Sequence, residues 1–313
     1  MELANKRVIV TGGAGVIGRE LVAKLEKIKA IIRVFDIEPR PKEFGNQVQY
    51  CQRDLSALNP LEFIQFNPDI IFHLAATFER TEEDLDFWQL NYQNEIFVNH
   101  LVFDAAKYCK NLKKFVLASS YLIYDPSLYL FKQAKDSPEK IIETDRINPR
   151  NLCGAAKLYA EKELEYLGRF KNYYQFTNIF ARIYRVYGKG SRDIISRWVR
   201  SALRQETIEV YQADNRFDYI YAGDVAEGLL RLAESKSASG VVNLGRGEFV
   251  AIKEAVAALK KYFSSLKVKA SRQTGLYEAS AADIDKLQKL TGWCPTVALE
   301  QGIKKIIDYE KKT

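Results

Sequence analysis

The stretch that decides the fold runs from Thr11 to Gly18 and reads TGGAGVIG. It follows a short apolar segment at Lys6–Val10 and opens a segment at Gly15–Lys29 whose apolar residues recur at helical spacing. A buried strand, a glycine-rich turn and an amphipathic helix in this order are typical of the first βαβ unit of a dinucleotide-binding domain.

Each glycine of this turn has a separate task. Gly12 permits a tight bend, Gly15 lets the backbone approach a pyrophosphate, and Gly18 allows the helix to pack closely on the strand. The first helical turn, which includes Val16 and Ile17, then presents N–H groups and a partial positive charge to the phosphates. The turn is therefore a predicted phosphate-binding site.

A carboxylate stands where the ribose of such a ligand would lie. The apolar segment Ile31–Phe35 is the predicted second strand, and Asp36 ends it 18 residues after Gly18. A carboxylate at this position accepts hydrogen bonds from the ribose hydroxyls of adenosine. It would also repel a 2′-phosphate, so the sequence favours NAD over NADP.

The rest of the chain alternates between strand and helix patterns. Further strands are predicted at Asp69–Leu74, Phe115–Ala118 and Gln175–Ile183, and long helices at Leu85–Lys110 and Leu152–Arg169. This alternation predicts an α/β fold, a Rossmann-type doubly wound parallel sheet with a smaller C-terminal α/β substrate lobe. We expect an NAD-binding domain at residues 1–187 and a substrate-binding lobe at residues 188–313, with the chain crossing between them more than once.

Composition excludes several classes of protein. The 313 residues are 47% hydrophobic and 28% charged, which argues against a disordered chain or a coiled coil. No apolar run approaches the roughly 18–20 residues of a membrane span. The four cysteines lack CxxC spacing, so neither a metal site nor a disulfide is expected, and a cytoplasmic protein is the default. The net charge of +7 fits an anionic ligand, whereas the lack of a Lys/Arg-rich run argues against nucleic acid.

Several motifs together resemble the extended short-chain dehydrogenase/reductases, particularly the nucleotide-sugar epimerase/dehydratase family. Besides Thr11–Gly18 they are Arg53–Leu55, His73–Ala76, Phe115–Tyr124 and Thr291–Pro295, and the resemblance covers nearly the whole chain. The resemblance implies a nucleotide-diphosphate sugar as substrate. It also implies a homodimer formed through the two long helices.

The resemblance further implies which residues line the site. It places the cofactor at Gly12, Gly15, Val16, Ile17, Gly18, Asp36, Asp54, Leu55, Leu74, Ala75, Ala76, Asn94, Lys157 and Tyr184, with Asn91 competing for the place of Asn94. It places the substrate at Thr77, Tyr121, Tyr124, Arg185, Arg192 and Arg216. Arg185 stands where the family has asparagine, and Arg216 lies one place earlier than the arginine of the family's Arg-Asp-aromatic motif near the diphosphate.

The catalytic position departs from the family. The family has a tyrosine and, four residues later, a lysine that holds the nicotinamide ribose and makes the phenol a better proton acceptor. Lys157 is present and Ser120 is the expected active-site hydroxyl, but Cys153 stands in place of the tyrosine. Three interpretations are open. The Cys153 thiol is the base, ionised with help from Lys157 and the oxidised nicotinamide ring; a displaced tyrosine, Tyr121 or Tyr124, takes this role; or the chain binds NAD without catalysis.

The residues after Ser120 narrow the reaction. In the family's 4,6-dehydratases, the active-site hydroxyl residue is followed by an Asp-Glu pair, which supplies the acid and the base for the elimination of water. In this chain, Ser120 is followed by Tyr121 and Leu122. The usual dehydration is therefore disfavoured, and an NAD-dependent epimerase that transiently oxidises a sugar ring hydroxyl is favoured. A nucleotide-sugar dehydrogenase or reductase, an atypical dehydratase and a non-catalytic NAD-binding protein are the alternatives.

Overall fold

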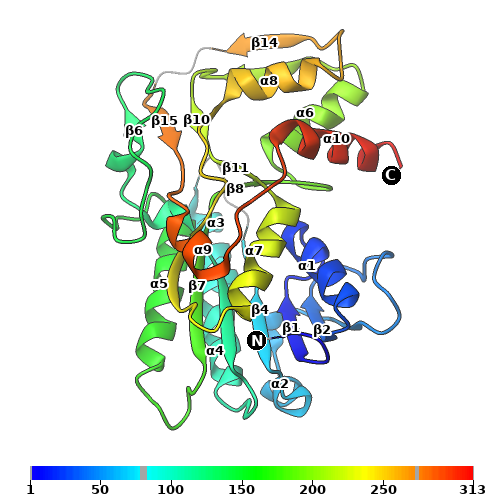
Figure 1. Ribbon diagram of the computed structural model, residues 1–313, viewed down its shortest axis with the longest axis vertical. Coiled ribbons are helices and arrows are strands. Elements are labelled where there is room, and N and C mark those ends of the chain that lie inside the picture. The colour runs from blue at the N-terminus through cyan, green and yellow to red at the C-terminus, as the bar shows by residue number, and fades with distance from the viewer. Residues whose placement is uncertain (1, 78–82, 272–274, 313) are drawn as a thin grey trace.

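The computed structural model describes residues 2–77, 83–271 and 275–312 (Figure 1). Seven parallel strands form the larger sheet in the order β12-β7-β5-β4-β1-β2-β3. They are β1 (Arg7–Thr11), β2 (Ile31–Asp36), β3 (Gln49–Gln52), β4 (Ile70–His73), β5 (Lys114–Ser120), β7 (Thr177–Ile183) and β12 (Gly240–Leu244). The strand order changes direction between β1 and β4, and ligands of open α/β sheets bind at such a point. The predicted Rossmann-type parallel sheet is confirmed.

Helices cover both faces of this sheet because successive side chains of each strand point to opposite faces. Val8 and Val10 share a core with α1 (Val16–Lys27), α7 (Ala222–Glu234) and α9 (Asp285–Thr291). Ile9, between them, shares a second core with α2 (Pro60–Phe66), α4 (Val98–Ala106) and α5 (Leu152–Leu167). None of the helices within the described ranges is long and apolar enough to cross a membrane.

A smaller lobe lies above the larger sheet in Figure 1. Its four-stranded sheet has the order β13 (Val250–Ala251), β10 (Arg216–Phe217), β15 (Tyr277–Ser280) and β6 (Leu130–Phe131). Two strand pairs complete it, β8 (Arg185–Tyr187) with β11 (Tyr219–Tyr221) and β9 (Ile208–Tyr211) with β14 (Val268–Ser271). Helices α6 (Ile194–Leu203), α8 (Ile252–Lys260) and α10 (Leu299–Glu310) share its apolar core.

The chain crosses between the two lobes several times. β6 comes from the first 187 residues but belongs to the smaller sheet, whereas β12 comes later and is an edge strand of the larger one. β12 pairs with β7 along its whole length, from Gly240 opposite Ile179 to Leu244 opposite Ile183. α7 and α9 also return to the larger sheet. No single cut between residues 187 and 188 separates the lobes in space.

The segment predicted as one helix at Leu85–Lys110 consists of three consecutive helical pieces. α3 (Leu85–Asn91) passes into a π-helical turn at Tyr92–Phe97, which continues as α4. A π turn holds more residues than an α turn, because its hydrogen bonds join residues i and i+5. The turn therefore changes which side chain of this segment faces the sheet.

His73, at the end of β4, connects two buried polar side chains. Its Nδ1 atom lies 2.5 Å from Thr11 Oγ1, and its Nε2 atom lies 2.7 Å from Asn99 Oδ1. Burial, together with the positive charge of Lys157, lowers the pKa of His73 to about 3. The imidazole is therefore neutral in the folded protein at any ordinary pH.

We expect this buried imidazole to make the protein less stable in mild acid. The unfolded chain gains a proton on His73 below a pKa of 6.5, whereas the folded chain does not until about pH 3. The contribution of His73 to stability is thus complete above pH 6.5 and is lost as the pH falls toward 3. Urea unfolding of the wild type and His73→Gln at about pH 5 and about pH 7.5 should show a smaller pH dependence in the variant. An equal pH dependence in both proteins would contradict this role.

Candidate active site

The glycine-rich turn makes the close contacts that its sequence predicts. Gly12 has a φ of +69°, and a Cβ atom there would lie 2.6 Å from the amide nitrogen of Ala75. A Cβ atom on Gly18 would collide with the carbonyl oxygen of Gly12, so α1 packs directly on the turn. At Gly15, the exposed N-cap of α1, a Cβ atom would meet only that same oxygen, at 3.2 Å. The backbone is therefore open on the side where a phosphate would approach.

Asp36 lies beside this turn. Its Oδ2 accepts a hydrogen bond from the Ala14 N–H at 2.7 Å, and its Oδ1 accepts one from the Glu38 N–H at 2.9 Å. A carboxylate has about four acceptor positions, so two remain for ribose hydroxyls. The open turn and the adjacent carboxylate together fit the pyrophosphate and ribose of a dinucleotide.

The other residues expected at the cofactor lie around the same edge of the sheet. Val16 and Ile17 are half-buried in the first turn of α1. Asp54 is exposed and caps the short turn Leu55–Ala57, in which Leu55 is buried. The segment that directly follows β4 contains Leu74, Ala75 and Ala76. Within the described parts of the chain, no group of three or more His, Cys, Asp or Glu side chains could hold a metal ion.

The second half of the site forms where α5 packs against the end of β5. A Cβ atom on Gly154 would lie 2.5 Å from the carbonyl oxygen of Leu122, so the first turn of α5 lies directly on the segment after Ser120. The Ser120 Oγ accepts a hydrogen bond from the Leu122 N–H at 3.2 Å. Cys153 and Lys157 are both buried and lie one helical turn apart on α5. The fold thus brings together the elements that carry Ser120, Cys153 and Lys157.

A buried carboxylate is the partner of Lys157. The Lys157 Nζ atom lies 2.9 Å from Oε2 of Glu95, whose side chain is 1% exposed. The other oxygen of Glu95 accepts a hydrogen bond from the N–H of Thr77, in the segment after β4. Glu95 was not predicted from the sequence, where the resemblance implies Asn94 or Asn91 in this region.

The π-helical turn explains the difference. Counting back from Ser120 along the sequence favours Asn94, but within the π turn Glu95 is buried and reaches Lys157, and Asn94 is only half-buried. The Asn91 amide donates to the carbonyl oxygen of Leu152 at 3.3 Å, so it holds α5 beside α3. A carboxylate therefore lies at Lys157 where the sequence analysis expected a neutral amide.

Three tyrosines pack beside the end of β5. Tyr121 stacks on Tyr184, with ring centroids 4.9 Å apart. The Tyr121 hydroxyl donates to Glu278 Oε1 at 3.0 Å, and the Tyr124 hydroxyl donates to Asn243 Oδ1 at 2.7 Å. Burial raises the pKa of Tyr124 to about 12 and raises the pKa of Tyr184 well above its usual value. Tyr124 and Tyr184 therefore hold their protons at neutral pH.

The three arginines expected at the substrate lie in different surroundings. Arg185 reaches a buried carboxylate, with Nη2 3.5 Å from Glu278 Oε2. Arg216 pairs with the exposed Asp136, with Nη2 and Oδ1 2.8 Å apart. Arg192 is exposed just before α6. The structure therefore places Arg185 alone of the three beside Tyr121.

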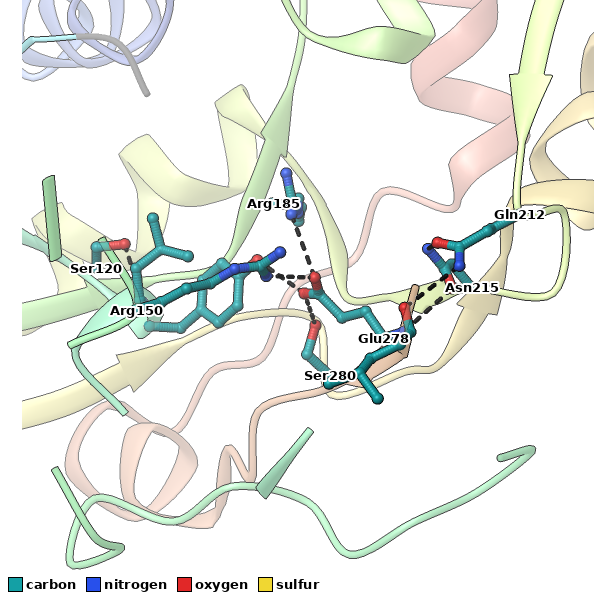
Figure 2. Close-up of polar contacts among 10 residues, drawn as sticks. Ser120, Arg150, Arg185, Gln212, Asn215, Glu278 and Ser280 are labelled. Carbon is teal, nitrogen blue, oxygen red and sulfur yellow. Dashed lines mark hydrogen bonds and ion pairs between the residues drawn. The ribbon is translucent and has the colours of Figure 1, made fainter. Parts of the chain in front are cut away.

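Two further residues of this region were missed by the sequence analysis. Arg150 and Glu278 come from distant parts of the chain, and Figure 2 shows that Arg150, Arg185 and Ser280 converge on the Glu278 carboxylate. Nothing in the sequence around Glu278 marks it as buried, because Tyr121, Arg150 and Arg185 come from distant segments that meet only in the folded chain.

Comparisons with known proteins agree with this geometry. Residues 8–245 match the NAD dependent epimerase/dehydratase family. The chain is 25% identical over 329 residues to dTDP-4-dehydro-6-deoxyglucose reductase of Escherichia coli, with 98% of each chain covered. It is 25% identical over 319 residues to a putative UDP-glucose 4-epimerase of Methanocaldococcus jannaschii, which covers 97% of this chain and 98% of the relative.

A solved structure shares the fold. The UDP-glucuronic acid 4-epimerase from Bacillus cereus, in complex with NAD, aligns with a TM-score of 0.82 at 24% identity. The alignment covers 98% of this chain and 99% of that one.

Removal of only one charge of the Glu95–Lys157 pair should strongly lower the free energy of unfolding. Glu95→Gln leaves the Lys157 ammonium buried without a counter-charge, and we expect the free energy of unfolding to fall by about 3 kcal/mol. Urea unfolding at neutral pH measures this loss. The double variant Glu95→Gln/Lys157→Met should regain most of it, because neither charge is then buried alone.

A matched control is Glu227→Gln. Glu227 pairs with Lys24 at 3.0 Å but is partly exposed, so its loss should cost only about 0–1 kcal/mol. Equal losses in Glu95→Gln and Glu227→Gln would show that the buried pair has no special energetic role.

Proposed function

Because this chain belongs to the NAD-dependent epimerase/dehydratase family, we propose that it acts as an epimerase that transiently oxidises a ring hydroxyl of a nucleotide sugar. One observation carries the proposal. The same edge of the sheet presents an open glycine-rich turn with Asp36 beside it and, across β4, the contact of α5 with the segment after Ser120. A cofactor site and a polar reacting site are thus adjacent.

The family is NAD-dependent, and NAD when bound supplies the acceptor for a hydride. In this chain the turn from Gly12 to Gly18 would bind the pyrophosphate, because its backbone is open at Gly15. Asp36 would accept hydrogen bonds from the adenosine ribose and exclude a 2′-phosphate. Lys157, held by Glu95, would bind the nicotinamide ribose. Thr77 has a buried hydroxyl with no hydrogen-bond partner among the residues that the structure describes, and it would contact the ligand.

The substrate hydroxyl would be oriented by Ser120 and would lose its proton to the thiolate form of Cys153. Of the alternatives, the Tyr124 hydroxyl donates to Asn243 and has a raised pKa, so it is a poor acceptor of a proton. The Tyr121 hydroxyl already donates to the Glu278 carboxylate. Cys153 occupies the helical position one turn before Lys157, which favours it as the base.

Two relatives guide the choice of substrate. Their names include a UDP-glucose 4-epimerase and a dTDP-sugar reductase, so we infer a nucleoside diphosphate sugar as substrate. Net reduction without epimerisation is the second candidate, favoured by the match to the E. coli reductase. Tyr121 and Leu122 follow Ser120 in place of an acid–base pair, which disfavours dehydration.

Measuring the turnover of UDP-sugars with NAD tests both the proposed epimerase function and the assignment of Cys153 as the general base. Cys153→Ala should lower kcat by about 100-fold or more, as expected when a general base is removed. Tyr124→Phe should keep most of the activity, because this hydroxyl is committed to Asn243. Full activity of Cys153→Ala together with its loss in Tyr121→Phe would move the base to Tyr121. Reduced nicotinamide that accumulates during turnover would indicate net oxidation in place of epimerisation.

Assays of the wild type also test the interpretation that the chain binds NAD without catalysis. If it binds NAD but turns over no sugar nucleotide, the chain is a binding protein. Activity that persists unchanged in Lys157→Met would contradict the placement of the nicotinamide ribose.

We further propose a homodimer formed through α5 and the segment from α3 to α4. Large apolar side chains on these helices are exposed: Leu85, Trp88, Tyr92, Phe97, Tyr159 and Tyr166. Exposed apolar side chains gathered on neighbouring helices are typical of protein–protein interfaces. Light scattering at micromolar concentration should give twice the chain mass of 35.9 kDa, and Trp88→Glu/Tyr159→Glu should give the single chain. A wild-type mass of one chain would contradict the dimer.

A further inference from the structure

We propose that Glu95 sets how strongly the site prefers the oxidised over the reduced form of NAD, because its carboxylate supplies the counter-charge of Lys157 and holds this lysine in place. This inference rests on the proposed function and goes beyond it, since it assigns control of the redox state of the cofactor to a residue that the resemblance to the family does not indicate. Glu95 acts through Lys157 and is therefore a positioning residue.

The Glu95 carboxylate has a partner on each oxygen. Its side chain is 1% exposed, and Oε2 lies 2.9 Å from the Nζ atom of Lys157. The other oxygen accepts a hydrogen bond from the Thr77 N–H. A buried carboxylate loses its hydration, and this cost is offset only where such partners stabilise the charged form. Both oxygens of Glu95 are therefore engaged by donors, one of which carries a positive charge.

Among the residues that the structure describes, Glu95 is the carboxylate that pairs with Lys157. The next carboxylate along α5, Glu161, lies one helical turn after Lys157 but has other partners. It accepts hydrogen bonds from Arg182 Nε at 3.0 Å, from Arg182 Nη2 at 2.7 Å and from the Ser119 hydroxyl. The positive charge of Lys157 therefore depends on Glu95 for its compensation.

The Glu95–Lys157 pair lies at the nicotinamide end of the expected cofactor site. Thr77, which donates to Glu95, belongs to the segment that follows β4. In the larger sheet β1 separates β4 from β2, which ends at Asp36. Glu95 and Asp36 are thus on opposite sides of the glycine-rich turn that follows β1. With Asp36 at the adenosine ribose, Glu95 and Lys157 are left for the nicotinamide half.

Charge near the nicotinamide ring distinguishes the two forms of the cofactor. The ring carries one positive charge in NAD and none in NADH. An ammonium group without a counter-charge would repel the oxidised ring and so favour the reduced one, and this effect is strong in a partly buried site. Glu95 cancels the repulsion and leaves the ammonium in place, because its three N–H donors can serve both a carboxylate and a ribose hydroxyl.

This preference affects the direction of hydride transfer. In the proposed reaction the sugar ring carbon gives a hydride to NAD while its hydroxyl loses a proton to the Cys153 thiolate, and both return when the ketone is reduced again. A site that stabilises the oxidised form of the cofactor favours the return of the hydride. Glu95 thereby limits the accumulation of the ketone.

The test measures the exchange of NAD for NADH on the protein. NADH is titrated into the NAD-loaded chain, and the fluorescence of bound NADH gives the ratio of the two affinities. Glu95→Gln should move this ratio about tenfold toward NADH, because the charge of Lys157 is then uncompensated. Lys157→Met should move it about tenfold toward NAD in mildly alkaline buffer, because the ionised carboxylate then acts on the ring alone. The double variant should return the ratio to within about twofold of the wild type, although it binds both forms more weakly.

The variants keep the test valid even where Glu95→Gln is too unstable to study. Lys157→Met and the double variant Glu95→Gln/Lys157→Met differ only at residue 95, so the carboxylate alone accounts for a difference between their ratios. Glu95→Asp keeps the charge and should keep most of the wild-type ratio. Melting curves show that each variant is folded before its affinities are compared.

A matched control is Glu310→Gln. Glu310 pairs with Arg200 at 2.8 Å in the smaller lobe, and its side chain is 11% exposed. This substitution also removes one carboxylate from a largely buried ion pair and changes the net charge by the same amount. It should leave the ratio of affinities unchanged.

An unchanged ratio in both Glu95→Gln and Lys157→Met would overturn the inference, because Glu95 would then only support the fold. A shift in Glu95→Gln that persists in the double variant would also overturn it, since the charge of Lys157 would not be the cause. Both results leave the proposed function standing. A wild type that binds neither NAD nor NADH would contradict the proposed function and the inference together.

Discussion

The lack of side chains at Gly12 and Gly18 lets β1, α1 and the segment after β4 touch one another, and the rest of the site depends on this contact. From there a continuous series of polar contacts crosses the sheet. Thr11 contacts His73 and accepts a hydrogen bond from the N–H of Ala75. The same segment then reaches Glu95 and, through it, Lys157 on α5. The glycine-rich turn and the first turns of α5 are thereby fixed relative to each other.

Most of the fold could be predicted because its signals are local. The alternation of apolar residues in β1, the glycine-rich turn and the position of Asp36 each depend on neighbours in the sequence. Glu95 could not be predicted, because a π turn changes the residue count and the partner of Glu95 lies on another helix. Glu278 was missed for a similar reason. Its charge is compensated by Arg150 and Arg185, which are far from it in the sequence but contact it in the folded chain.

The resemblance to the family places Arg216 at the substrate, and the sequence gives no sign of its partners. In the structure Arg216 pairs with Asp136 and Glu254, which are far from it in the sequence. Two buried carboxylates pair with positive groups in this region: Glu95 pairs with Lys157, and Glu278 pairs with Arg150 and Arg185.

Because the chain crosses repeatedly between the two lobes, the larger sheet depends on segments from the second half of the sequence. A fragment ending at residue 187 would lack β12, and it would also lack α7 and α9, which cover one face of the larger sheet. The core on that face combines residues of both halves of the sequence, among them Val116 of β5 and Leu229 of α7. The core of the smaller lobe, in contrast, comes from residues 187–307. Local opening of α7 and α9 would therefore remove part of the cover of the larger sheet while the core of the smaller lobe stays intact.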